Sequence, residues 1–371
     1  MEDTKKRKLK YESKDVPDQI FRQIKTKTDR YFALTHSSKN GNKLLGLKIG
    51  ALVGVIALSY FALIHSTSFF SLFFSYLFFA GSFLLLGINI GHDAAHHCFT
   101  GNKKLDDFFF QLIFGLQGLC GYFWQKRHNE SHHIYPNIPD YDSDLEMTGL
   151  LLLNPNQETK FFHKYQHLYA PFLYMLFSLV WIFYQDFEMF FIKDQANLKF
   201  EVTPAIEWVK LVFIKLNYII LFLVLPIYFS TLPLETILIA YFLMNFVLSL
   251  FLAFTFFISH HVLETVYSTP DKHKNVLNNS WVRHQIITTV DFNEESRMAN
   301  FIFGGFNNHV AHHLFPEISH IHYPVITRII KDTLKENNLD WYKSFSFFYG
   351  VRSHLRHLKV TARTIIAQLA N

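Results

Sequence analysis

The chain lacks several features that ordinary soluble or secreted proteins have. Its two cysteines, Cys98 and Cys120, are not spaced as zinc ligands and give no disulfide framework, so we expect a reducing compartment. Only 18% of the 371 residues are charged, which is low for a soluble domain. There is no internal repeat or low-complexity block. The first apolar run begins near residue 44, too late for a signal peptide, so no secretory leader is expected.

Apolar residues are what the chain has in excess. Half of the residues are hydrophobic and 42 are Phe, which is typical of a membrane protein. Four apolar runs are long enough to cross about 30 Å of hydrocarbon as helices. They are residues 44–63, 68–90, 212–230 and 234–258. The turns within each pair are short and carry no Lys or Arg, so we expect two hairpins whose turns face away from the cytoplasm.

The N-terminal segment is basic. Residues 1–48 carry thirteen Lys or Arg against six Asp or Glu, which indicates a cytoplasmic segment beside an anionic leaflet. The run at residues 5–8 could instead contact nucleic acid, but no basic-aromatic module follows it, so nucleic acid is not an expected partner. We predict a basic segment over 1–43, a membrane domain over 44–350 and a cytoplasmic tail over 351–371.

Two shorter apolar stretches, 108–123 and 170–185, are interrupted or flanked by polar residues. If both crossed the membrane, the histidine clusters described below would face opposite sides. We therefore interpret them as interfacial or re-entrant helices. The predicted fold is an all-α integral membrane protein with four transmembrane helices, interfacial helices and a cytoplasmic cap lined by histidines.

Three short clusters hold nine of the 21 histidines. They are His92, His96 and His97; His128, His132 and His133; and His309, His312 and His313. Histidines three or four residues apart share a helix face. A further pair, His260 and His261, ends the fourth apolar run. The pattern predicts a metal site with many imidazole ligands.

The number of imidazoles exceeds what one ion needs. A single zinc takes four ligands at most, whereas these histidines could give two metals four or five each. Imidazole suits iron, zinc, copper and nickel alike. Iron is favoured because a buried apolar substrate offers no acidic proton, so its C–H bonds call for oxygen activated at a redox metal.

These strings resemble the three histidine boxes of integral-membrane fatty acid desaturases. Residues 91–96 (Gly-His-Asp-Ala-Ala-His) are similar to the first box. Residues 128–138, followed by residues 142–146, and residues 312–324 resemble the second and third boxes of bacterial linoleoyl-CoA-type and front-end acyl desaturases. The resemblance spans about residues 10–350. It implies two iron ions, O2 as co-substrate and insertion of a cis double bond into an acyl chain linked to CoA or lipid. It also implies a bacterial inner-membrane protein with a cytoplasmic active site.

Carried over by position, the resemblance implies metal ligands in each box and one after the last span. They are His92, His96, His128, His132, His133, His309, His312 and His313, with His261 preferred to its neighbour His260. His97 is a weaker candidate. Residues 281–289 resemble a family stretch just before the third box, and His284 within them could be a ligand or could orient one. Front-end desaturases usually open the third box with Gln and place Glu before the paired histidines. This chain has His309 and Ala311 there, so the bond position stays open.

Other polar residues are expected to have supporting or surface roles and not to bind the metals. Asp93 and Glu130 could be acid-base catalysts, but we expect them to orient ligand imidazoles. Asp142, Asp144 and Glu146 could bind a second cation, but we expect a solvated acidic loop. His163, His167, His354 and His357 are expected at the surface, and His320 and His322 have no evident ligand role. No haem-binding His-Pro-Gly-Gly string is present, so a separate ferredoxin, rubredoxin or cytochrome is expected to donate electrons.

Three alternatives to a desaturase remain. A hydroxylase could use the same scaffold and metals. A non-catalytic metal transporter or receptor is a second possibility, although transporters place ligands at mid-membrane in broken helices. A zinc-dependent membrane hydrolase would use about three histidines and leave the others without a role.

Overall fold

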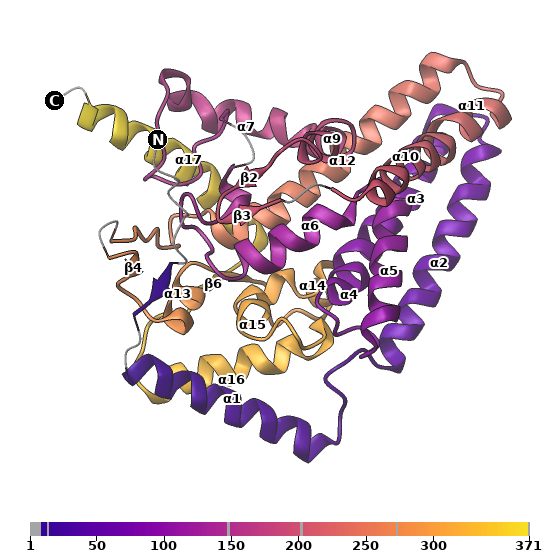
Figure 1. The fold of residues 1–371 in the computed structure, drawn as a ribbon. Coiled ribbons are helices and arrows are strands. Elements are labelled where there is room, and N and C mark those ends of the chain that lie inside the picture. Colours follow the sequence, from indigo (N-terminus) through magenta and orange to yellow (C-terminus); the bar gives the residue numbers. More distant parts are fainter. Residues whose placement is uncertain (1–8, 13–14, 147–148, 201–202, 272–273, 370–371) are drawn as a thin grey trace.

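The computed structural model describes residues 9–12, 15–146, 149–200, 203–271 and 274–369. The basic run at residues 5–8 lies outside these residues. The described chain is mostly helical (Figure 1), as predicted. Its strands are two residues long and occur in pairs: β1 (Lys10–Tyr11) with β4 (Val276–Leu277), β2 (Asp194–Gln195) with β3 (Leu198–Lys199), and β5 (Asp291–Phe292) with β6 (Ser344–Phe345).

Four helices of the described chain are long and apolar enough to cross a membrane, which confirms the four predicted runs. They are α2 (Lys43–Ile64), α3 (Phe69–Leu86) continued to Ala95, α10 (Ala205–Ile219) continued to Phe229, and α12 (Leu234–His260). The third begins at Ala205, before the predicted start at residue 212, because Glu207 and Lys210 interrupt the apolar run in its first turns without ending the helix. Asn42 and Ser68 cap α2 and α3 by accepting hydrogen bonds from Leu45 N and Ser71 N.

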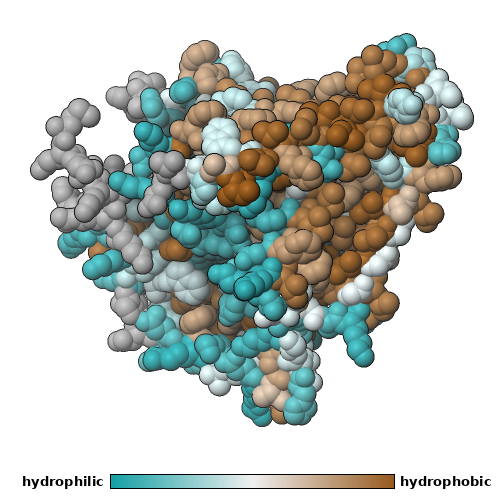
Figure 2. Space-filling view, turned by 45° about the vertical axis from the view of Figure 1, so that its right-hand side comes forward, coloured by the Kyte–Doolittle hydropathy of each residue, from teal (hydrophilic) through white to brown (hydrophobic). Residues whose placement is uncertain are grey.

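Short turns continue two of these helices. After α3 come the π-turn η1 (Gly87–Gly91) and α4 (His92–Ala95), and after α10 come η6 (Ile220–Val224) and α11 (Leu225–Phe229). The long helices pack side by side, α3 between α2 and α12. Most of their remaining surface is apolar and exposed, including Leu47, Phe61 and Phe213. Figure 2 shows this as a broad hydrophobic region on one side of the molecule. A bilayer is the solvent that such a surface requires.

The two shorter apolar stretches form bent segments. The first comprises α5 (Lys103–Leu116) and α6 (Gly121–Arg127), separated by a turn in which Gly118 has φ +79°. The second runs from η4 (Phe161–Tyr165) and α7 (Gln166–Met175) into α8 (Phe177–Val180), η5 (Trp181–Gln185) and α9 (Asp186–Met189), with a bend of 66° after Met175. Such a bend fits either a broken span or a re-entrant loop.

The remaining helices cover the end of the bundle that carries the histidines. They are η2 (His128–His132), η3 (Ser143–Glu146), α13 (Trp281–Ile287), α14 (Arg297–Phe303), η7 (Phe306–Asn308), α15 (His309–Leu314), η8 (His320–His322), α16 (Tyr323–Glu336) and α17 (Phe347–Leu369). Helix α1 (Asp15–Thr35) lies along α16 at the bottom of Figure 1. Helix α17 crosses the predicted boundary at residue 351 and packs against α12 and α7, so the proposed tail is not separate from the main body.

Candidate metal centre

Each histidine box lies on a short helical turn. The first begins at α4, directly after the π-turn η1, and the second occupies the π-turn η2 after α6. Such π-turns inside helices are frequent at functional sites. The third lies on α15, which follows a tight turn where Gly305 has φ +91°. A side chain at Gly305 would meet His320 and Tyr323 at 2.8 Å or less, so only glycine fits this turn.

The structure brings the boxes together as two groups of imidazoles. Within each group the ligand nitrogens lie within 4.8 Å of one another. The first group is His92, His96, His128 and His312, and the second is His132, His260, His309 and His313. His133 lies between them: its Nε2 is 3.1 Å from His128 Nε2, and its ring centroid is 4.5 Å from that of His313. The two groups are therefore adjacent and could hold two metal ions.

The hydrogen bonds behind the rings determine where their lone pairs point. Nδ1 of His260 lies 3.2 Å from Thr288 O, and Nδ1 of His313 lies 2.9 Å from Gln285 Oε1. Because both oxygens can only accept, each Nδ1 carries the proton and each Nε2 of a neutral ring presents a lone pair. Those two Nε2 atoms face each other at 3.2 Å. A cation between them turns a repulsive contact into two bonds.

Other nitrogens of the centre also need a partner. His96 Nε2, His133 Nδ1, His309 Nδ1 and His312 Nε2 are buried and have no hydrogen-bond partner among the described residues. A buried polar atom without a partner costs about 1–3 kcal/mol. Metal coordination in the first group would satisfy His96 Nε2 and His312 Nε2, so the donor set there fits bound metal.

Burial keeps these imidazoles neutral. It lowers the pKa of His96, His128, His133, His309, His312 and His313 well below the ordinary value, and neutral imidazole is the form that binds metal. His132 differs. Burial opposes its imidazolium form, but the carboxylates of Asp142 and Asp144 outweigh this and raise its pKa to about 9.

The structure places His260, not His261, in the second group, contrary to the preference drawn from the sequence. Helix α12 ends at His260. His261 lines the same cavity but belongs to neither group, and its Nδ1 lies 3.5 Å from the Tyr267 hydroxyl. His97 has φ +58° and lies 3.6 Å from Asp107, outside both groups. His284 Nε2 lies 2.9 Å from Pro136 O, so it supports the neighbouring loop instead of joining the groups.

Several predictions about the surrounding polar residues are wrong. Asp142 is buried, lies 3.2 Å from His132 Nδ1 and accepts a hydrogen bond from Asn137 N. Asp93 does not orient a ligand but lies 2.9 Å from His320 Nδ1, and the Glu130 side chain is exposed. Three of the four supposed surface histidines, His163, His354 and His357, are buried, and His167 is half-buried. Glu146 lies on η3, but its side chain is outside the described part.

Sequence reasoning missed Gln285, Thr288 O and Asp142 as the acceptors that orient the rings. For Asp142 and Gln285 the signal was available, since each lies in a string already compared with the desaturase boxes. Their role depends on the folded chain, because Gln285 is 28 residues from His313.

Three adjoining cavities lead from the metal groups into the apolar bundle. The metal cavity is lined by His128, His132, His260 and His309 together with Trp124, Trp181 and the half-exposed Asp144 and Gln185. The deep cavity lies among Phe83, Phe222, Met244 and Leu252. A connecting cavity shares Trp124 and Phe306 with the first, and Leu119 and Leu252 with the second. Together they could hold a long apolar chain.

Comparison with known proteins agrees with this geometry. The profile of the family described as "Fatty acid desaturase" matches residues 67–345. An acyl-lipid (8-3)-desaturase of Physcomitrium patens is 30% identical over 97% of this chain and 75% of its own length. The Delta(5) fatty acid desaturase A of Dictyostelium discoideum is 32% identical over 74% of this chain and 60% of its own length. A Synechocystis sn-1 linoleoyl-lipid 6-desaturase is 29% identical over 74% of this chain and 76% of its own.

The first prediction separates His260 from its neighbour. His260 Nε2 lies 2.9 Å from His309 Nε2, so His260→Ala removes a nitrogen from the second group, whereas His261→Ala does not. We expect His260→Ala to lower metal affinity at least about tenfold, since even residues that only support ligands have effects of this size. His261→Ala, the matched control, should keep wild-type metal content by elemental analysis. The reverse pattern would restore the sequence-based preference.

A second prediction concerns pH. Below about 9 the metal-free protein holds His132 protonated, so metal uptake must displace a proton from it. Apparent affinity should then rise about tenfold per pH unit from this group and level off near its pKa. Asp142→Asn removes the nearer negative charge, lets burial lower the pKa, and should flatten this dependence. Titration of metal-free protein with Fe²⁺ at several pH values measures both slopes, and equal slopes would contradict the assignment.

Proposed function

The chain belongs to the fatty acid desaturase family of oxidoreductases, and on that premise we propose that it is a membrane di-iron enzyme that inserts a cis double bond into a lipid-linked acyl chain. The observation that supports this most is the pair of adjacent imidazole groups at the end of an apolar cavity system. Iron is among the metals that imidazole suits, and the apolar cavities suit the methylenes of an acyl chain.

The proposed reaction balances as follows. One –CH2–CH2– unit, O2, two electrons and two protons give –CH=CH– and two water molecules. The bound irons would supply activation of O2 for breaking unactivated C–H bonds. The protein contributes orientation: Thr288 O, Gln285 and Asp142 hold the Nδ1 protons so that the opposite nitrogens face inward. Trp124, Phe256 and Phe306 exclude water and hold the methylenes beside the metals.

The two electrons require a donor. We propose a separate one-electron carrier, a ferredoxin, rubredoxin or cytochrome, that docks on the cytoplasmic side. No haem-binding string lies in this chain, and the histidine groups could receive electrons through the residues that cover them.

We propose a lipid-linked substrate with the new bond in the carboxyl half of the chain. The relatives' names include linoleoyl-lipid 6-desaturase and Delta(5) fatty acid desaturase. In this structure the half-exposed Asp144 and Gln185 line the metal cavity, whereas neither of them lines the apolar deep cavity. A polar head group near Asp144 would leave a short carboxyl segment before the metals and a longer methyl segment beyond. Front-end desaturases usually have Gln at the position of His309. Because His309 belongs to the second group, its imidazole still offers a nitrogen ligand there.

A hydroxylase on the same scaffold is the second candidate, because the imidazole groups alone do not decide between hydrogen abstraction and oxygen insertion. A transporter or receptor is less well supported: the imidazole groups lie at the ends of α3 and α12, not midway along them.

Expression in a host with a known fatty acid profile tests the reaction. We expect new acyl species lighter by two hydrogens, dependent on O2 and abolished by His312→Ala, because His312 belongs to the first imidazole group. Gas chromatography with mass spectrometry of the host lipids measures this, and the purified wild type should contain two iron ions per chain. Species heavier by one oxygen atom and without a new double bond would instead identify a hydroxylase. Active protein with a single zinc ion would contradict the di-iron centre.

We also propose that the histidine groups and both termini face the cytoplasm. The turns before α3 and α12 carry no charge. At 1.5 Å per helical residue, His92 and His260 lie about 35–40 Å along the chain from the first residues of these two helical segments. In intact cells, a membrane-impermeant thiol reagent should label Thr67→Cys and Thr231→Cys, both exposed in the turns. Glu130→Cys, exposed beside the second box, should react only after permeabilisation. Labelling of Glu130→Cys in intact cells would contradict this topology.

A further inference from the structure

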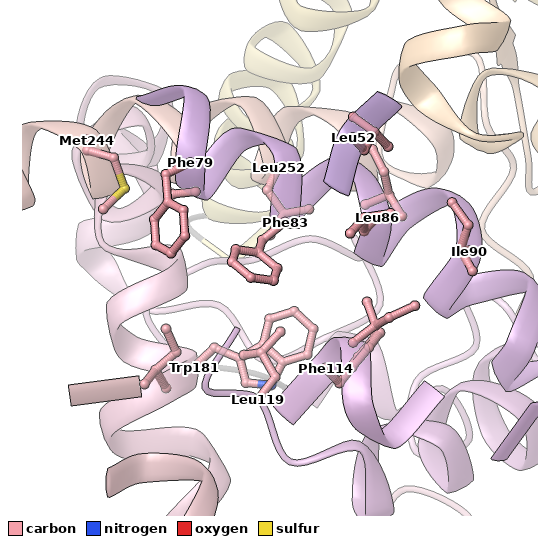
Figure 3. Packing of buried hydrophobic residues seen from close by; sticks show 14 of the residues in the cluster. Leu52, Phe79, Phe83, Leu86, Ile90, Phe114, Leu119, Trp181, Met244 and Leu252 are labelled. Atoms are coloured by element: carbon pink, nitrogen blue, oxygen red, sulfur yellow. The ribbon is translucent and has the colours of Figure 1, made fainter. Parts of the chain in front are cut away.

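Trp181 occupies a special position among the cavities. It lies on η5 and is 8% exposed, and it is the one described residue that lines the metal, connecting and deep cavities together. Figure 3 shows Trp181 and Leu119 on one side of the apolar interior and Phe83 on the other. A chain that passes from the metal cavity to the deep cavity must therefore pass the indole.

A buried ion pair lies beside this indole. Trp181 is close to the carboxylate of Asp186, which follows it by five residues on the same helical segment. Asp186 Oδ2 accepts hydrogen bonds from Lys215 Nζ at 2.5 Å and from Cys120 N at 2.8 Å. Lys215 Nζ donates to Gly118 O at 2.6 Å. The network thus joins α10, the turn after α5 and the η5–α9 segment.

The ion pair lies in apolar surroundings. The side chains of Lys215 and Asp186 are only 7% and 6% exposed. Removing two charges from water costs several kcal/mol per ion, so a buried pair is weak evidence for a stabilising role. Such a pair can instead hold neighbouring groups in one arrangement. Here the Lys215–Asp186 pair would hold the large, rigid indole of Trp181 in the wall of the cavities.

We propose that Trp181 is a specificity-determining residue, which limits how far the methyl end of the acyl chain extends beyond the metals. Asp186 and Lys215 are positioning residues that act through it. This inference rests on the proposed function. If the ring limits the depth of the methyl end, it also limits the length of acyl chain that places the correct methylenes at the metals.

Chain-length preference tests the inference. Cells that express each variant receive a mixture of acyl chains of different lengths, and the desaturated products are quantified by mass spectrometry. Trp181→Leu should raise the ratio of longer to shorter products about tenfold, a size that a few methylenes in an apolar pocket can give. Trp181→Phe keeps an aromatic ring but a smaller one, and should shift the ratio about threefold. Asp186→Leu combined with Lys215→Met should shift it in the same direction.

Two controls make the outcomes distinguishable. Trp208→Leu removes a half-buried tryptophan that lines none of the three cavities, and should leave the profile unchanged. The metal content of each purified variant reports whether it is folded. If Trp181→Leu loses its metal, the product profile of Trp181→Phe decides the test. A wild-type profile in the metal-loaded Trp181 variants would overturn the inference and leave the proposed function intact. Absence of desaturated products from the wild type would instead overturn the proposed function.

Discussion

Imidazole nitrogens that face one another without protons repel, and the rest of this structure depends on that constraint. The His260 and His313 lone pairs meet at 3.2 Å in a buried site where imidazolium is disfavoured. Such an arrangement is stable with positive charge between the rings. Because the two groups together draw on α4, η2, α12 and α15, every intervening segment must return to the same end of the bundle. The bent segments α5–α6 and α7–α9 make those returns.

The surroundings of the centre follow from the same requirement. Each oriented ring needs an acceptor for its Nδ1 proton, and these acceptors come from different parts of the chain. Asp142 is held by the backbone of Asn137 and Asp144, and the Asn137 side chain donates to His260 O. The neighbouring Pro136 carbonyl contacts His284. A residue outside the centre thereby helps to fix an acceptor within it, which explains why His284 can lie in a desaturase-like string without belonging to the imidazole groups.

Polar groups inside the apolar bundle are confined to paired positions. Besides Lys215 and Asp186, the hydroxyls of Tyr218 and Tyr241 lie 2.9 Å apart, and the Ser178 and Ser249 hydroxyls lie 2.6 Å apart. In surroundings without water, each such group must find a partner within the protein. These contacts tie the α7–α9 segment to α10 and α12, so a segment that is short of a full span is held in place by polar contacts as well as by apolar packing.

The sequence by itself determined the membrane class, the four long helices and the histidines of the three boxes. Run length and the three- or four-residue spacing of His92, His96, His128 and His132 are local properties, which an isolated helix already has. Only the tertiary structure places His260, and not His261, in an imidazole group, because that depends on where α12 ends and on which side α15 approaches it. The tertiary structure also buries Asp142, brings the Asp93 carboxylate to the His320 ring and places Trp181 beside three cavities. Each of these depends on contacts between segments distant in the chain, which local spacing does not encode.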